Sequence, residues 1–163
     1  MAQRRKHRYL CRAQMSRYNF AIPVVSTHRI VFTRNAFAPD NPHLAEILHE
    51  GGGRRACVFI EHAVAAAWPG LVDAVPAYFA PLAVDFCGST VLPGGEAAKA
   101  DDALVRHVWE TLDQARIDRH SYALAIGGGA FLDAVGFAAA TAHRGVRLLR
   151  FPTTTLSLSL IHI

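Results

Sequence analysis

The residues best suited to chemistry are three consecutive glycines, Gly127, Gly128 and Gly129, which follow an apolar run at residues 122–126. Glycines at the carboxyl end of a strand let the backbone turn sharply and approach a ligand closely. The free amides at the start of the following helix would face that ligand, and the helix dipole favours a pyrophosphate there. Asp133, in the first turn of that helix, could accept a hydrogen bond from the ligand. The pattern predicts a phosphate-binding turn, with a ligand-free strand-to-helix turn as the alternative.

The turn does not identify its ligand through a standard motif. A dinucleotide fingerprint has Gly or Ala where Leu132 stands, and a P-loop needs a Lys that this segment lacks. A second triple glycine, at residues 51–53, precedes an apolar run instead of following one, so we interpret it as a helix end and loop. The motifs alone therefore leave open which phosphate compound is bound.

Alternating strand and helix patterns must position the turn. A continuous apolar run typical of a parallel strand covered on both faces occurs at residues 56–60, and further strands are predicted at residues 82–86, 122–126 and 146–151. Helices are predicted after an Asn41-Pro42 cap and at residues 62–67, 70–80, 101–116 and 130–142, with short extended segments at 20–25 and 29–33. The alternation predicts an α/β fold: a Rossmann-like open, mostly parallel sheet with helices on both faces.

The basic character of the chain comes from its first residues. The net charge of the 163 residues is +4, and residues 1–17 contain six Lys or Arg and no acid, whereas acids outnumber bases in the remainder. We expect residues 1–17 to be a disordered tail, or translation upstream of a start at Met15, with electrostatic binding of nucleic acid by this arm as the weaker alternative. No run of about 20 apolar residues and no secretory signal is present, so we expect a cytoplasmic protein without a membrane partner.

The metal- and thiol-bearing side chains do not form a recognisable site. The three cysteines are too few and too widely spaced for a disulfide framework or a zinc site, and Cys57 and Cys87 fall in or beside apolar runs, as buried thiols do. The histidines lack clustered partners. We therefore predict core cysteines and no metal ligand in this chain.

Several segments in order resemble the amino-terminal domain of 3-dehydroquinate synthase and its sugar phosphate cyclase relatives. The glycine turn continues through Asp133, Gly136 and Phe137, and is followed by Arg144-Gly145 and Pro152-Thr153-Thr154. Upstream, residues 93–99 are similar to the Pro-x-Gly-Glu-x-x-Lys segment of the family, and residues 58–64 to its first strand and ribose-binding turn. The resemblance covers about residues 55–157 and implies NAD as cofactor.

The resemblance also implies a role for individual residues. Cofactor contacts would come from Glu61 at the ribose, Glu96 and Lys99 on the adenosine side, Gly127, Gly128, Gly129 and Asp133 at the pyrophosphate and ribose, and Thr153 and Thr154 at the nicotinamide half. Arg144 would contact the substrate phosphate of a neighbouring subunit, which implies a homodimer of the full-length enzyme. Leu132 and Glu61 stand where the family commonly has Gly and Asp, which favours a divergent branch.

The implied reaction is the cyclisation of a seven-carbon sugar phosphate with loss of phosphate, in which bound NAD transiently oxidises a hydroxyl and a divalent metal, zinc or cobalt, polarises oxygens. The metal ligands would lie in a carboxyl-terminal helical domain that this sequence does not contain. We therefore expect residues 18–157 to be the NAD-binding domain of a two-domain enzyme, residues 158–163 to be non-native, and the isolated chain to be inactive. The alternatives are a metal-dependent alcohol or glycerol dehydrogenase, whose turn differs at Ala130 and Gly136, and a non-catalytic nucleotide-binding fragment.

Overall fold

The computed structural model describes residues 18–23, 28–95 and 102–154. The chain divides into two units, residues 1–30 and 31–163. In the first unit the rings of Tyr18 and Phe20 stack with their centroids 6.4 Å apart, and none of its described residues belongs to a helix or strand. The expected extended segments at 20–25 and 29–33 therefore form no strand where they are described, and the basic tail at 1–17 lies outside the described residues.

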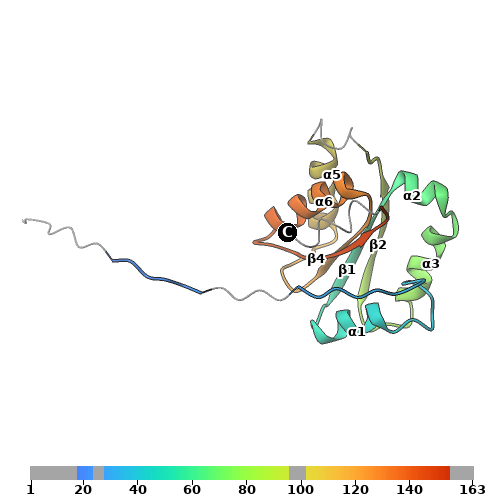
Figure 1. The fold of residues 1–163 in the computed structure, drawn as a ribbon, viewed down its shortest axis with the longest axis horizontal. Helices are drawn as coiled ribbons and strands as arrows, with labels where there is room; N and C mark the ends of the chain where they lie inside the picture. The colour runs from blue at the N-terminus through green and yellow to red at the C-terminus, as the bar shows by residue number, and fades with distance from the viewer. Residues whose placement is uncertain (1–17, 24–27, 96–101, 155–163) are drawn as a thin grey trace, which may run out of the picture. The chain divides into compact units, whose positions relative to one another are not determined.

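The second unit contains every described helix and strand (Figure 1). Its four strands pair in parallel in the order β2-β1-β3-β4. This arrangement confirms the predicted α/β class with an open parallel sheet. In chain order the elements are α1 His43–Glu50, β1 Arg55–Glu61, α2 His62–Ala67, α3 Gly70–Phe79, β2 Asp85–Leu92, α5 Ala103–Gln114, β3 Tyr122–Gly127, α6 Gly129–Thr141 and β4 Arg147–Pro152.

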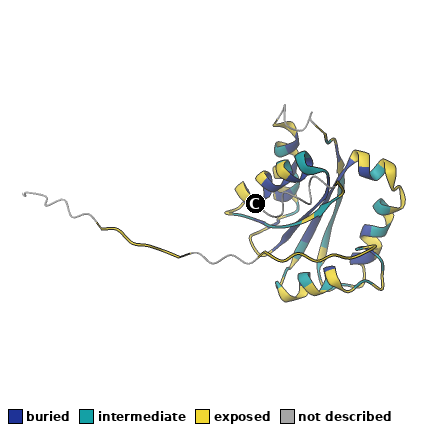
Figure 2. Ribbon diagram, viewed as in Figure 1, coloured by how far each residue is buried: buried dark blue, intermediate teal, exposed yellow. Residues whose placement is uncertain are grey.

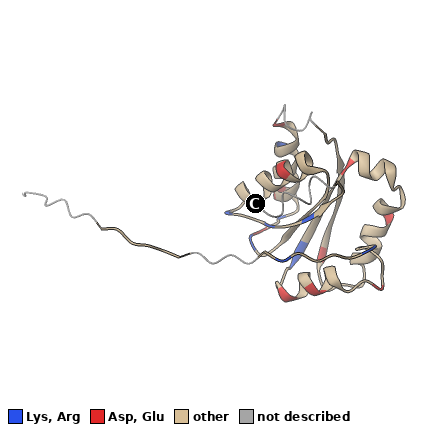
Figure 3. Ribbon diagram, viewed as in Figure 1, with Lys and Arg blue, Asp and Glu red and all other residues tan. Residues whose placement is uncertain are grey.

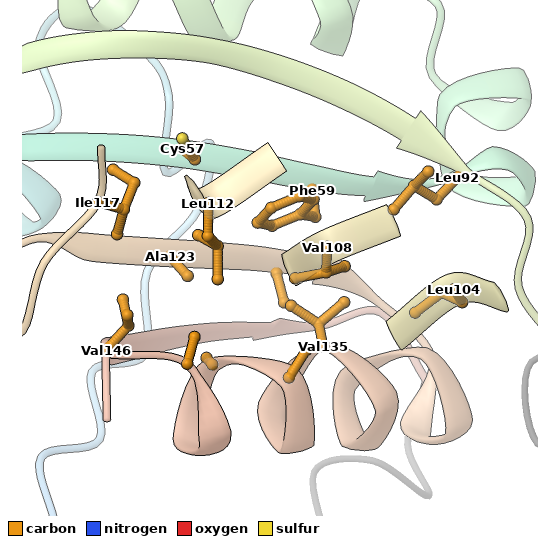
Figure 4. Packing of buried hydrophobic residues seen from close by; sticks show 14 of the residues in the cluster. Cys57, Phe59, Leu92, Leu104, Val108, Leu112, Ile117, Ala123, Val135 and Val146 are labelled. Atoms are coloured by element: carbon orange, nitrogen blue, oxygen red, sulfur yellow. The ribbon is translucent and has the colours of Figure 1, made fainter. Parts of the chain in front are cut away.

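The sheet is covered by helices on both faces, and the central strands β1 and β3 are buried almost throughout (Figure 2). On one face, Phe59 of β1 packs with Leu112 of α5 and Val135 of α6 (Figure 4). On the other face, Val58 of β1 packs with residues of α1 and α3, among them Leu48. Because both faces of β1 and β3 are covered, their sequences are continuously apolar, which is why the prediction placed them correctly.

The predicted strand at residues 82–86 has the wrong bounds, since only Asp85 and Phe86 of it belong to a strand. The strand β2 begins at Asp85 and ends at Leu92, and it lies at the edge of the sheet. Leu82 and Val84 precede β2 and pack, partly buried, against the core on the α1 and α3 face of the sheet, which explains their apolar character. Most of β2 is only half-buried, so its sequence lacks the continuous apolar run that identifies a central strand.

The first triple glycine has a structural role, as predicted. Gly51 follows α1, and Gly52 has a positive φ of 60°. A Cβ atom would lie 1.7 Å from the Tyr122 hydroxyl oxygen if placed on Gly51, and 2.3 Å from Cε2 of that ring if placed on Gly53. Glycines are required here because the Tyr122 ring rests directly on the loop, and the Arg147 guanidinium in turn donates a hydrogen bond to the Gly51 carbonyl.

The two described cysteines are free thiols. Cys57 is buried among the α5 and α6 side chains, and burial raises the pKa of its thiol to about 12. Cys87 is half-buried beside the same cluster. Cys57 is therefore a core residue, as predicted, whereas Cys87 lies at the margin of the core.

Among the described residues of the second unit, arginines lie on strands, on α5 and in loops, and Asp and Glu lie on both helices and strands (Figure 3). In the part of the chain that the structure describes, no helix combines the length and apolar character needed to cross a membrane.

Candidate functional site

The connections of the sheet change direction between β1 and β3. The chain leaves β1 through α2 and α3, which pack on one face, and leaves β3 through α6, which packs on the other. Neighbouring parallel strands that lead to opposite faces open a crevice at their carboxyl ends, where open α/β sheets bind ligands. Glu61 ends β1 at this point, and Gly127 ends β3. The topology thus locates a candidate site independently of any motif.

The triple-glycine turn forms one wall of this crevice. Gly128 is extended, with φ −79° and ψ 173°, and α6 begins at Gly129. The first hydrogen bond of the helix runs from the Leu132 amide to the Gly128 carbonyl at 2.9 Å. The amides of Gly129 and Ala130 precede that bond and have no acceptor within the helix, and both residues are half-exposed. These two amides are well placed to donate to an anionic ligand.

The first two glycines of the turn differ in how closely other atoms surround them. A Cβ atom on Gly127 would lie 2.6 Å from Cδ1 of Phe131 and 2.8 Å from a carboxylate oxygen of Glu61. A Cβ atom on Gly128 would meet only ordinary contacts, 3.5 Å from that carboxylate and 3.7 Å from Cγ2 of Thr154. The fold therefore requires glycine at 127, whereas a Cβ atom at 128 would fit against Glu61 and Thr154 without a clash.

Replacing Gly127 by alanine should destabilise the chain by about 1–3 kcal/mol, the usual cost of inserting a methyl group into a packed region. Urea denaturation followed by circular dichroism measures this loss. Gly70→Ala is the matched control, since a Cβ atom on Gly70 meets nothing within 4 Å. An unfolding free energy for Gly127→Ala equal to that of the control would contradict the close packing around Gly127.

Glu61, at the end of β1, is in direct contact with the turn, and its side chain points at backbone amides. One carboxylate oxygen accepts a hydrogen bond from the Gly128 amide at 2.6 Å, and the other accepts one from the Gly95 amide at 3.1 Å. The residue is only 9% exposed. The predicted ribose contact is thus a buried carboxylate that already has two backbone partners.

The end of β4 lies beside the same turn. The Thr153 amide donates to the Gly127 carbonyl at 3.0 Å, and the methyl group of Thr154 lies near Gly128. Both threonines are exposed. The structure therefore brings Thr153 and Thr154 together with the glycine turn, as their predicted role requires.

Asp133 is one turn into α6 and faces a residue that sequence reasoning missed. A carboxylate oxygen of Asp133 lies 3.9 Å from a guanidinium nitrogen of Arg150 on β4, and both side chains are largely in contact with solvent. An exposed pair of this kind contributes little to stability. A Cβ atom on Gly136 would lie 2.7 Å from Nη2 of Arg150, so this glycine makes room for the arginine. The sequence signal was limited to Arg150 being one of two charges in the predicted strand at residues 146–151.

Of the other predicted site residues, Arg144 does not join the crevice. Arg144 precedes β4 with a φ of 70°, so it lies at the amino-terminal edge of the parallel sheet, opposite the turn. Glu96 and Lys99 lie outside the described residues. Leu132 is 3% exposed and packs into the core beneath α6, which directs its bulk away from the crevice.

The described residues suit a dinucleotide better than a metal. Amides at a helix start that have no acceptor within the helix suit a pyrophosphate. No three His, Cys, Asp or Glu side chains within residues 18–23, 28–95 and 102–154 are grouped to hold a metal ion. No metal-dependent step is therefore assigned to these residues.

Comparisons with known sequences identify relatives of this chain. A family model described as 3-dehydroquinate synthase N-terminal matches residues 89–159. The 3-dehydroquinate synthase of Rhizobium rhizogenes is 38% identical over 113 residues, which cover 69% of this chain and 29% of that protein. The enzyme of Neisseria gonorrhoeae is 35% identical over 120 residues, covering 71% and 31% respectively. The chain thus spans about three-tenths of the length of the curated relatives that it matches.

Solved structures extend the likeness. The 2-epi-5-epi-valiolone synthase of Streptomyces hygroscopicus, determined with NAD+ and Zn2+ bound, superposes with a TM-score of 0.69 at 28% identity, covering 84% of this chain and 35% of that one. A 2-deoxy-scyllo-inosose synthase complexed with carbaglucose-6-phosphate, NAD+ and Co2+ superposes with a TM-score of 0.58 at 24% identity, covering 72% and 31%. The second likeness supports the fold alone.

Proposed function

We propose that this chain, which belongs to the family of 3-dehydroquinate synthases and related sugar phosphate cyclases, binds NAD at its triple-glycine turn and supplies the cofactor-binding half of such an enzyme. The observation that carries the proposal is the turn itself. It lies at the switch point of the sheet, and the half-exposed residues Gly129 and Ala130 carry amides that have no acceptor within the helix. The related valiolone synthase binds NAD+, which supports the same cofactor here.

Each residue of the crevice has a proposed part in holding the cofactor. The amides of Gly129 and Ala130 donate to the pyrophosphate, and the α6 dipole adds to their attraction. Asp133 accepts a hydrogen bond from a ribose hydroxyl, and Thr153 and Thr154 border the nicotinamide half. Glu96 and Lys99 are proposed for the adenosine side, and Arg144 for the substrate phosphate of a neighbouring subunit in a homodimer.

The proposed reaction of the whole enzyme is a phosphate-eliminating cyclisation of a seven-carbon sugar phosphate. NAD, when bound, supplies a reversible hydride acceptor. The part of this chain is to hold the dinucleotide in one orientation at the carboxyl edge of the sheet. The rigidity of the central strands suits that task, because β1 and β3 are buried on both faces.

Replacing Asp133 by alanine should weaken NAD binding about tenfold or more, because a hydrogen bond to a charged group is worth roughly 1.5–3 kcal/mol. Isothermal titration calorimetry of the 163-residue chain with NAD measures the change. Asp73→Ala is the matched control, since Asp73 is an exposed acid on α3. Unchanged affinity in the Asp133 variant removes that residue from the site, whereas no binding by the parent chain contradicts the proposed function itself.

A further inference from the structure

We infer that Glu61 is a positioning residue: its carboxylate ties together the two glycine turns that border the crevice and fixes the shape into which the dinucleotide fits. The inference rests on the proposed function for its ligand, but its evidence is the geometry of the free chain. It also differs from the role that the resemblance implies, in which Glu61 contacts the ribose directly.

The position of β1 in the sheet makes such a tie possible. β1 lies between β2 and β3, so the loops that follow these two strands are separated by the width of β1. Glu61, the last residue of β1, accepts from the Gly95 amide on one side at 3.1 Å and from the Gly128 amide on the other at 2.6 Å. A single carboxylate thus links the loop that follows β2 with the loop that follows β3.

Both loops are shaped around this carboxylate. A Cβ atom on Gly94 would lie 2.0 Å from one carboxylate oxygen of Glu61, and a Cβ atom on Gly127 would lie 2.8 Å from the other. Any side chain at either position would displace the acid. An acid that is 9% exposed is stable only when donors satisfy its oxygens, and the two amides are those donors. The glycines and the acid therefore form one structural group, the Glu61 cluster.

The Glu61 cluster determines where a phosphate can bind. The Gly128 amide is committed to Glu61, and the negative charge of Glu61 disfavours a phosphate oxygen at that amide. The amides of Gly129 and Ala130 remain for the pyrophosphate. Glu61 thereby directs the anionic part of the ligand one residue further along the turn and holds Gly128 extended while it binds.

The length of the side chain separates the two roles. An aspartate is one methylene shorter and cannot reach both turns, although it could still contact a ribose from the end of β1. A glutamine keeps the length but replaces one acceptor oxygen by a donor, which opposes one of the two amides. If Glu61 links the two turns, both Glu61→Asp and Glu61→Gln lose that link. If Glu61 only contacts the ribose, Glu61→Asp keeps its function.

The first measurement is NAD affinity, by calorimetry on the 163-residue chain. We expect Glu61→Asp and Glu61→Gln each to weaken NAD binding about tenfold or more, the equivalent of losing one hydrogen bond to a charged group. Gly94→Ala should have a similar effect because it displaces the carboxylate without altering it. Glu110→Gln, an exposed acid on α5, and Gly70→Ala, where a Cβ atom has open space, are the matched controls and should retain the parent affinity.

The second measurement needs no ligand. Amide hydrogen exchange, followed by NMR, should accelerate about tenfold for at least one of Gly95 and Gly128 in each Glu61 variant, because that amide loses a charge-assisted hydrogen bond. Amides in the middle of β3 should exchange at the parent rate, which shows that the variants are folded. A role limited to contact with the ribose would leave the exchange of these two amides unchanged.

The outcomes distinguish the two proposals. Unchanged exchange at Gly95 and Gly128, or parent NAD affinity in Glu61→Asp, overturns the positioning role and leaves the proposed function standing. Accelerated exchange together with no NAD binding by the parent chain overturns the proposed function and leaves the tie between the turns standing. Accelerated exchange with weakened NAD binding in Glu61→Asp and Gly94→Ala supports both.

Discussion

Gly128→Ala should bind NAD at least about tenfold more weakly than the parent chain, a loss of roughly 1.4 kcal/mol or more, while its unfolding free energy stays within about 0.5 kcal/mol of the parent. The added methyl group meets only ordinary contacts in the free chain, so folding is hardly affected. It fills the half-exposed space over which the backbone must approach a pyrophosphate closely. Calorimetric titration with NAD and urea denaturation together measure the two effects.

This variant separates a ligand site from a tight turn. If the glycines served the turn alone, Gly128→Ala would be silent in both measurements and only Gly127→Ala would matter. Parent-like NAD affinity in Gly128→Ala would therefore remove the space beside Gly128 from the site. Gly127 and Gly128 are neighbours on the same turn. A loss of stability in Gly127→Ala together with a loss of NAD affinity alone in Gly128→Ala is therefore the result expected of a ligand bound at Gly128.

Phe131→Ala should destabilise the chain by about 3–5 kcal/mol, the usual cost of removing a buried aromatic ring. Phe131 is fully buried in the first turn of α6, and its ring lies against Gly127 beneath the crevice. The cavity left by the ring would remove support from the turn as well as from the core. Urea denaturation monitored by circular dichroism measures the loss.

Phe137 on the same helix provides the matched control. Its side chain is 57% exposed, and the centroid of its ring lies 6.4 Å from the centroid of the Trp109 ring. Phe137→Ala should cost less than about 1 kcal/mol, since partly exposed aromatic pairs contribute little beyond their buried area. Equal losses in the two variants would contradict the burial of Phe131 beneath the turn.

The fold could be predicted where a segment is covered on both sides. β1 and β3 are continuously apolar because helices pack on both of their faces, and Leu104, Val108 and Leu112 define the buried side of α5 at helical spacing. The edge strand β2 could not be located in this way. Its residues include Gly88, Ser89 and Thr90 and are half-exposed, so the apolar turn before it gave a stronger signal than the strand itself.

The candidate site could be predicted only where its residues are close in the sequence. The turn at Gly127 and the nearby Asp133 form one local pattern, and both lie where expected. The partners of Glu61 could not be predicted, because Gly95 and Gly128 are 34 and 67 residues away and meet the acid only through the strand order. The contact between Arg150 and Asp133 depends in the same way on how β4 packs against α6.

The two arginines of β4 have a consequence beyond the crevice. Within the described residues β4 pairs only with β3, and such an edge is a template on which a second chain can add a strand. Arg147 is engaged with the Gly51 carbonyl and Tyr122 on one face, and Arg150 with Asp133 on the other. A further strand added from another molecule would have to accommodate fixed positive charge on both faces of β4. The two arginines of β4 thus also oppose aggregation along this edge.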